Sequence, residues 1–358
     1  MIHAQAGRCA HQRVLNRVLL CAFDDAGNES ARHEVRQVDA LVVAIHQGCE
    51  EESRRLIARV EHVDSAFAHA RHSLVDAAET LNFRSMDRHL RRQILREDIE
   101  GTRAQHIVIR AENFSKATVI LSHTGSAQAA LNQTVEVETG DSANLTVVSL
   151  QEWDDTVLHA SNQRLALGRD SKLTHIVVSF GGDLVRVCAD TDFRGPGAEL
   201  NMLGIYFVDG GQHLEHRVFV DHSQPNCYSR VTYKGALQGK DAHSVWIGDC
   251  LIREAADGTD TYELNRNLVL TEGAKADSVP NLEIENGEIE GAGHASATGR
   301  FDDEQLFYLM SRGVPEHEAR RLVVRGFFAE LINQIGVPEV VEHLMATVEA
   351  ELAKSRNN

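Results

Sequence analysis

The 358-residue chain has no long hydrophobic run. No apolar stretch approaches the ~18–20 residues that a membrane-spanning helix needs. The opening residues, MIHAQAGRCAHQRVLNRVLL, also lack the uninterrupted apolar block of a secretion signal. These two absences predict a cytoplasmic protein with no membrane partner.

Positive charge is scarce. Lys and Arg together number 36 against 53 Asp and Glu, which gives a formal net charge of −17. The first 100 residues contain 14 Arg, no Lys and 16 acidic residues, so nearly all of the negative excess lies beyond residue 100. Binding to a phosphate backbone requires a basic face. The charge therefore argues against a nucleic-acid partner.

Cysteines are few and scattered. The six are Cys9, Cys21, Cys49, Cys188, Cys227 and Cys250, and no two form a Cys-x-x-Cys pair. Their gaps suit neither a zinc site, nor a disulfide scaffold, nor a resident iron–sulfur cluster. His213, His216 and His222 do not close a metal site either, because side chains alternate between the faces of a strand. We therefore expect no cofactor in the isolated chain.

Motifs for nucleotide hydrolysis and acyl transfer are also missing. The Gly-Lys pair in GALQGKD, at 235–241, lacks the spacing and the Ser or Thr of a P-loop, and no Gly-x-Ser-x-Gly occurs. Asp257, Asp260 and Glu263 fall in a segment that predicts a turn, where carboxylates commonly accept turn hydrogen bonds. The sequence thus predicts a protein that is not an enzyme.

The chain divides into three regions that differ in composition and in the periodicity of their apolar residues. Residues 1–103 predict α-helices, including a stripe of Met86, Leu90 and Ile94. Residues 104–301 alternate Val-, Ile- and Thr-rich runs with small polar turns, with a recurrence of about 26–29 residues and no helical crossovers. This pattern predicts a β-solenoid, with a β-sandwich as the alternative. Residues 302–358 predict helices, punctuated by Gly313 and Gly336.

The C-terminal helices carry apolar stripes. Val324, Phe328, Leu331 and Ile335 fall on one face of the longest predicted helix. Such a face most often packs within its own chain, and the alternative is an interface. After a solenoid, the candidates for its contact are the solenoid's end or another protein.

A single histidine stands out in GAGHASATG, residues 291–299. We predict this segment to be a loop between an acidic strand and the first C-terminal helix. Small residues permit a sharp turn or the close approach of another surface. The segment is therefore either a tight turn or a loop that presents His294.

Three segments resemble the SufB/SufD family of iron–sulfur cluster assembly proteins, and its SufD branch most closely. They are DHSQPNCYSRVTYKGALQG, the block from 258 to 314, and EARRLVVRGFFAELI. The block at 258–314 matches the family in residue identity, order and spacing. The resemblance covers about residues 104–355, whereas residues 1–103 differ from the usual SufD N-terminal region. It implies a mainly β fold: a right-handed parallel β-helix over 104–301, flanked by α-helical regions at 1–103 and 302–358.

The resemblance also implies a function. Such a protein is a scaffold subunit that pairs with a SufB-like paralogue and binds a SufC-like ABC-type ATPase to build and transfer iron–sulfur clusters. The cluster would be transient and would exist only in the complex. The implied ATPase contact is the C-terminal helical face: Val324, Phe327, Phe328, Leu331 and Ile335.

His294 matches the histidine that the family places at the interface where the cluster is built. The resemblance therefore implies a metal ligand shared with the partner, or a proton relay. Ala292 stands where many family members have a cysteine, so this chain supplies no thiolate from that position. Two other readings remain: a β-helix enzyme acting on a polysaccharide, and a purely structural solenoid adaptor, in which His294 would be incidental.

Overall fold

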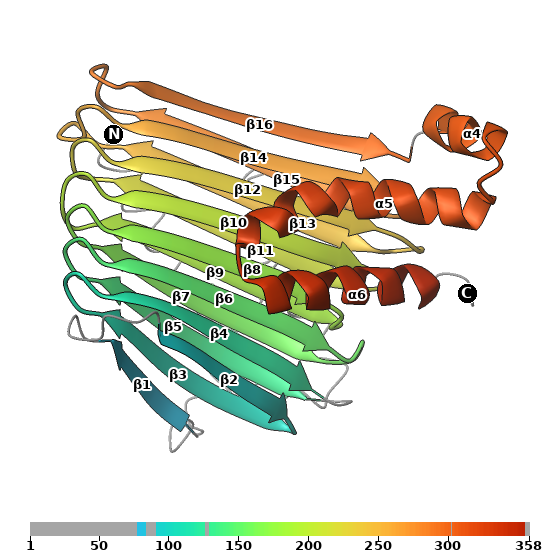
Figure 1. The fold of residues 1–358 in the computed structure, drawn as a ribbon, viewed down its shortest axis with the longest axis horizontal. Coiled ribbons are helices and arrows are strands. Elements are labelled where there is room, and N and C mark those ends of the chain that lie inside the picture. Colours follow the sequence, from blue (N-terminus) through green and yellow to red (C-terminus); the bar gives the residue numbers. More distant parts are fainter. Residues whose placement is uncertain (1–76, 84–90, 126–128, 302, 355–358) are drawn as a thin grey trace, which may run out of the picture.

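Two parallel β-sheets form the body of the protein (Figure 1). The structure is a computed structural model that describes residues 77–83, 91–125, 129–301 and 303–354. Sheet A contains the odd-numbered strands β1 (Ala77–Phe83), β3 (Thr102–Ala111), β5 (Ala130–Thr139), β7 (Leu158–Leu167), β9 (Leu184–Phe193), β11 (His213–His222), β13 (His243–Ile252) and β15 (Lys275–Ile284). Sheet B contains the even-numbered strands β2 (Arg91–Ile99), β4 (Lys116–Gly125), β6 (Asn144–Trp153), β8 (Lys172–Phe180), β10 (Glu199–Val208), β12 (Tyr228–Leu237), β14 (Asp260–Val269) and β16 (Gly291–Arg300).

Successive strands alternate between the two sheets, and each strand pairs in parallel with the strand two places along the chain. The chain therefore winds as a β-solenoid of about seven turns, and the predicted mainly β solenoid is confirmed. Partners in register lie 26 residues apart at Leu158 and Leu184 but 32 apart at Tyr228 and Asp260. The recurrence seen in the sequence is this coil length, which grows toward the C-terminal end.

One corner of the solenoid is built by a column of residues with left-handed backbone. Each lies two positions before a strand of sheet B: Phe114, Ser142, Asp170, Gly197, Asn226 and Gly258, with φ between 51° and 74°. The N–H of each donates to a carbonyl of the next coil, for example from Ser142 to Arg169 at 2.8 Å. Glycine is required at 197, because a Cβ there would lie 2.2 Å from a carboxylate oxygen of Asp170. The corner thus tethers each coil to the next.

The helical prediction for residues 1–103 is wrong where the structure describes them. Residues 77–83 form β1 and residues 91–99 form β2. Ile94, which we assigned to a helical stripe, pairs in register with Ile120 of β4. An apolar spacing of three to four residues fits a helix, but a ladder to the next coil satisfies the same backbone groups and outweighs that preference. The solenoid therefore begins before residue 104, while Met86, Leu90 and residues 1–76 lie outside the described residues.

Three helices follow the last strand: α4 (Asp303–Ser311), α5 (Glu316–Ile332) and α6 (Pro338–Lys354), with a 3₁₀ turn at Asn333–Ile335. Helices α5 and α6 lie against the outer face of sheet B (Figure 1). Apolar side chains of that face form one cluster with the two helices: Ile120, Val148, Leu150, Ile176, Val178, Phe180, Leu203, Ile205, Phe207 and Ala236. None of the helices in the described residues is long and apolar enough to span a membrane.

Polar contacts fix both helices on the sheet. Lys234 of β12 is buried, and its Nζ donates to the backbone carbonyl of Phe327 at 2.9 Å and to the carboxylate of Glu330 at 2.6 Å. On α6, the imidazole of His343 lies 2.8 Å from the carboxylate of Glu152 on β6. A buried ammonium is tolerated only where it is paired, so Lys234 fixes the position of α5 on the sheet.

The predicted ATPase-binding face must be corrected, because it is internal. Val324, Phe328, Leu331 and Ile335 are each 3% exposed or less and pack against sheet B and α6, while Phe327 is partly buried. The outer face of sheet B is apolar, so it needs a cover, and this stripe supplies it. The stripe therefore does not contact a partner in this conformation.

Replacing Phe328 by Ala should lower the free energy of unfolding by about 3–5 kcal/mol, because the side chain is fully buried between α5 and sheet B. Equilibrium urea denaturation measures the change. Phe307→Ala is the matched control: this side chain is 74% exposed, and we expect a change below about 0.5 kcal/mol. A small loss in Phe328→Ala would contradict the packing of α5 on the sheet.

Candidate functional site

His294 lies on a strand and not in a loop, so that prediction is corrected. Residues Gly291–Arg300 form β16, which pairs along its whole length with Asp260–Val269 of β14. The ladder to β14 satisfies backbone groups that a loop would leave to solvent. In sheet B, β16 has β14 as its one neighbour, so it is an edge strand at the C-terminal end of the stack (Figure 1). His294 therefore lies at an open end of the solenoid.

Contacts with the neighbouring strands explain why the residues around His294 are small. A Cβ on Gly293 would lie 3.1 Å from the ring of Tyr262 on β14, which is 41% exposed. The hydroxyls of Ser296 and Ser278 lie 2.8 Å apart and join β16 to β15. Small side chains thus allow the last coil to close over the one before it. They leave His294 as the one large group on the first half of β16.

The imidazole of His294 stands over a buried carboxyl group. His294 and Glu263 are partners in register on β16 and β14. Partners in adjacent parallel strands point to the same face of a sheet, with strands about 4.8 Å apart. Glu263 points into the solenoid and is 1% exposed, whereas His294 is exposed because no further coil among the described residues covers it.

Glu263 is an unusual core residue. Neither carboxyl oxygen has a hydrogen-bond partner among the residues that the structure describes. Burial, with a smaller contribution from Asp249, raises the pKa of Glu263 to about 8. Space for the carboxyl comes from Gly248 on β13, where a Cβ would lie 2.7 Å from Oε2 of Glu263. The nearby indole N–H of Trp246 is also without a partner. The last coils therefore enclose unpaired polar groups, which proteins tolerate mainly at functional sites.

All four central inward positions of β14 are polar: Thr261, Glu263, Asn265 and Asn267. The amide of Asn265 donates to the hydroxyl of Tyr206 at 3.0 Å, and that hydroxyl donates in turn to Asn267 at 2.5 Å. Burial raises the pKa of Tyr206 beyond its usual range. These hydrogen bonds stabilise the coil that lies beneath β16. Glu263 takes no part in them.

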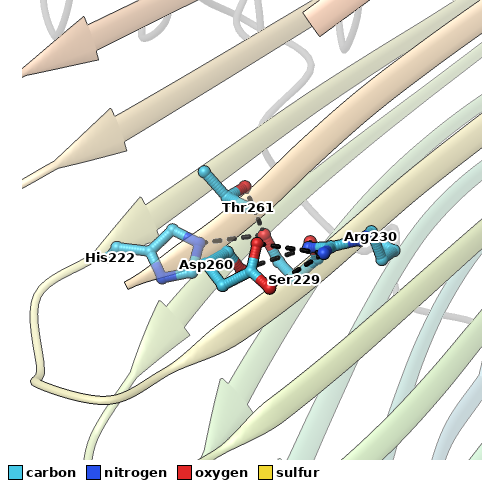
Figure 2. Close-up of polar contacts among 5 residues, drawn as sticks. All are labelled: His222, Ser229, Arg230, Asp260 and Thr261. Carbon is cyan, nitrogen blue, oxygen red and sulfur yellow. Dashed lines mark hydrogen bonds and ion pairs between the residues drawn. The ribbon is translucent and has the colours of Figure 1, made fainter. Parts of the chain in front are cut away.

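A second polar cluster, drawn in Figure 2, contains a serine beside a histidine. Nε2 of His222 lies 2.9 Å from the hydroxyl of Ser229, which lies 2.6 Å from that of Thr261. The nearby Asp260 pairs with Arg230, at 2.9 Å from both oxygens, and not with the histidine (Figure 2). His222 and Ser229 are fully buried, and burial lowers the pKa of His222 to about 4. The cluster links coils and is no hydrolytic site.

The described cysteines, Cys188, Cys227 and Cys250, are buried free thiols. Cys250 lies 3.5 Å from the hydroxyl of Thr261, and burial raises the pKa of its thiol to about 12. A protonated thiol is a poor nucleophile and metal ligand. Cys9, Cys21 and Cys49 lie outside the described residues.

The remaining candidate metal ligands are dispersed. Inside the solenoid, His216 stacks on the ring of Tyr206 and lies tilted against that of Tyr233, while His213 contacts His243 on the other face of sheet A. Within the described ranges, no group of three or more His, Cys, Asp and Glu side chains is arranged to hold a metal ion. Any ion held at the open end would therefore need further ligands from outside this part of the chain.

Residues 93–327 match the model of the SufBD core domain of the SUF system for iron–sulfur cluster assembly. The match spans the solenoid, its open end and most of α5. The chain belongs to the SufBD family of iron–sulfur cluster assembly proteins. The resemblance found in the sequence is thereby confirmed, and both His294 and Glu263 lie within the residues that match the SufBD core domain.

Individual SufBD relatives agree. The chain is 57% identical over 253 residues to the SufBD family protein Rv1462 of Mycobacterium tuberculosis, 30% identical over 252 residues to SufD of Bacillus subtilis, and 25% identical over 263 residues to SufD of Escherichia coli. These alignments cover 69%, 69% and 73% of this chain and 63%, 57% and 61% of the relatives. The chain thus spans less than two thirds of the length of these SufBD proteins.

Of the residues at the open end, His294 was predicted from the sequence and Glu263 was not. His294 is exposed at the open end, and Ala292 pairs with Thr261 beside it. Glu263 was missed, because Gly258 and the acids around it predicted a turn. Its alternating neighbours in TDTYELNRNL, polar at every second position, were the available signal for a strand.

Replacing Glu263 by Gln should change how stability depends on pH. The folded state holds the Glu263 proton up to about pH 8, while the unfolded chain releases it near 4.5. Between these values the titration of Glu263 lowers the free energy of unfolding of the wild type as pH rises, by at most about 1.4 kcal/mol per pH unit, and the variant lacks this contribution. In urea denaturation from pH 5 to pH 9, the free energy of unfolding of the variant should therefore increase relative to that of the wild type up to about pH 8.

Glu285→Gln is the control for this series, because Glu285 is exposed on the same last coil. Its stability curve should run parallel to that of the wild type. A Glu263→Gln curve that also runs parallel would contradict the burial of a protonated Glu263.

Proposed function

We propose that this chain is a non-enzymatic scaffold subunit of a SUF complex. It pairs with a SufB-like paralogue through the open end of the solenoid and contributes His294 to the place where a cluster is built. The observation that carries this proposal is the position of His294, exposed on an edge strand above a buried carboxyl.

Edge strands favour such pairing. The free edges of β15 and β16 end their sheets, and an unpaired edge offers a row of N–H and C=O groups to another strand. Strand β15 is half-buried along most of its length, with Ile284 47% exposed. A second solenoid placed against this end would cover these groups and enclose His294. The iron–sulfur cluster is the product of the complex and not a resident cofactor of this chain.

His294 provides the chemistry in this proposal. A neutral imidazole suits iron, and it can also move protons near neutral pH. Within the described residues, Ala292 and the buried thiols supply no thiolate at the open end, so in this proposal the partner supplies the sulfur ligands. The polysaccharide enzyme has less support, since the unpaired acid at this end is buried and lies beneath β16.

The ATPase contact is proposed on α4 and not on the buried stripe of α5. Exposed apolar side chains gather there: Phe307, Tyr308 and Met310 are 74%, 57% and 43% exposed. Leu322 on α5 adds a fourth, 42% exposed. Several exposed apolar groups on neighbouring helices are typical of a docking surface.

His294→Ala should leave the complex of the three subunits intact but abolish cluster build-up. The exposed side chain contributes little to folding, and its removal deletes the one imidazole at the open end. Cluster absorbance and iron content of the co-expressed complex measure the effect, after subunit ratios are shown to be normal. Iron loading at the wild-type level would show that His294 has no role in cluster assembly and would favour the structural adaptor.

Phe307→Glu should prevent co-purification of the ATPase with this subunit while leaving the thermal unfolding midpoint unchanged. Phe114→Glu is a matched control. Phe114 is also exposed, at 72%, but it lies at a corner of the solenoid before β4 and not on the C-terminal helices. Retention of the ATPase by the Phe307 variant would reject α4 as the contact.

A further inference from the structure

The register of the last two coils brings together two side chains that commonly bind metals. Glu263 and His294 are in-register partners on β14 and β16, and both point to the inner face of sheet B. Their strands lie about 4.8 Å apart, a separation over which a carboxylate and an imidazole can share one ion. One of the two is covered and the other is accessible from the open end.

The carboxyl of Glu263 has no partner within the described part of the chain. Both of its oxygens are unpaired although the residue is 1% exposed. An unpaired acid in the core is costly, and such groups are normally satisfied by another side chain, a water molecule or an ion. The neighbouring polar residues do not fill this need, because Asn265 and Asn267 bond to Tyr206 and to each other.

The surroundings also leave room at the carboxyl. Gly248 faces it from sheet A, and any side chain there would collide with Oε2 of Glu263 and with the ring of Trp246. The next coil places two small residues beside this position: Ser278 is in register with Trp246, Ser296 with Asn265, and one hydrogen bond joins the two serines. Oxygen and imidazole nitrogen donors at this spot suit divalent first-row metals rather than soft Cu(I).

We propose that Glu263 and His294 together bind one divalent first-row metal ion at the open end of the solenoid, and that this ion is ferrous iron on its way into the cluster. Two protein ligands leave coordination positions for water or for a partner's groups. The identification of the ion as iron rests on the proposed function, whereas the two-residue site does not.

Cobalt(II) is a suitable probe, because its visible absorption reports nitrogen and oxygen ligands. The full-length chain, purified alone with its affinity tag removed, is titrated anaerobically with Co²⁺ and followed by absorption and calorimetry. We expect Glu263→Gln and His294→Ala each to weaken binding by about tenfold or more. The controls Glu285→Gln and His317→Ala, at exposed positions, should bind as the wild type does. Equal binding by wild type and Glu263→Gln would overturn the proposal.

Stability separates a ligand from a structural residue. Co²⁺ should raise the thermal midpoint of the wild type but not that of Glu263→Gln, because only the chain that binds the ion is stabilised by it. Without cobalt, Glu263→Gln should be at least as stable as the wild type, since the carboxyl has no partner to lose. A variant that is less stable without cobalt would show a structural role and would overturn the proposal.

Iron loading of the co-expressed complex distinguishes this inference from the proposed function. Loss of cluster in both Glu263→Gln and His294→Ala supports both. Loss in His294→Ala alone, with cobalt binding unaffected by Glu263→Gln, removes Glu263 from the site and leaves the function standing. Cobalt binding that needs both residues, with clusters built normally in both variants, keeps the metal site and rejects the proposed function.

Discussion

A strand of a parallel solenoid can satisfy its backbone only through the adjacent coils. The described coils between the two ends of the stack obey that constraint, and the left-handed corner residues each donate a hydrogen bond to the next coil. The constraint fails at the ends of the described stack: β1 and β2 have one neighbour each, and so do β15 and β16 of the last coil. The inner row of that coil is uncovered for the same reason, which is why His294 is exposed although it points inward. The position of the candidate site follows from the architecture more than from any local motif.

The solenoid was predictable because its coils repeat. Runs of Val, Ile and Thr separated by small polar turns reveal strands wherever they recur, and no helical segment intervenes. Register was not predictable, because coil length drifts from 26 to 32 residues and pairing depends on the corners. The proximity of Glu263 to His294, 31 positions apart, therefore came only from the structure. The strand at 91–99 was missed because Ile94 and its neighbours have a helical spacing that the ladder to β4 overrides.

The small residues at 291–299 show how composition can mislead. Glycine and alanine predicted a loop, but these residues form β16, and at Gly293 the ring of Tyr262 would lie only 3.1 Å from an added Cβ. The apolar stripe that contains Phe328 and Leu331 was ambiguous in a similar way. The sequence shows that an apolar helix face must be buried, but it does not show whether its own chain or a partner buries it. Here the outer face of sheet B is apolar over several coils, and α5 folds back onto it. Among the helices, the exposed apolar side chains of α4 and Leu322 of α5 are then the ones available to a partner.

Four polar side chains of β14 point into the solenoid, and the carboxyl of Glu263 has no hydrogen-bond partner among the described residues. Unpaired polar atoms also occur in the middle coils, at the imidazoles of His159 and His216, but these groups are not acids. An apolar residue at 263 would make a more stable isolated protein, since burying an unpaired acid costs free energy. Proteins keep such costs where function needs them. The unpaired Glu263 lies one coil beneath the exposed His294, at the end of the stack where both described sheets end in an edge strand. The energetic defect, the accessible imidazole and the unpaired edges therefore coincide, which is the arrangement expected of a site completed by another subunit.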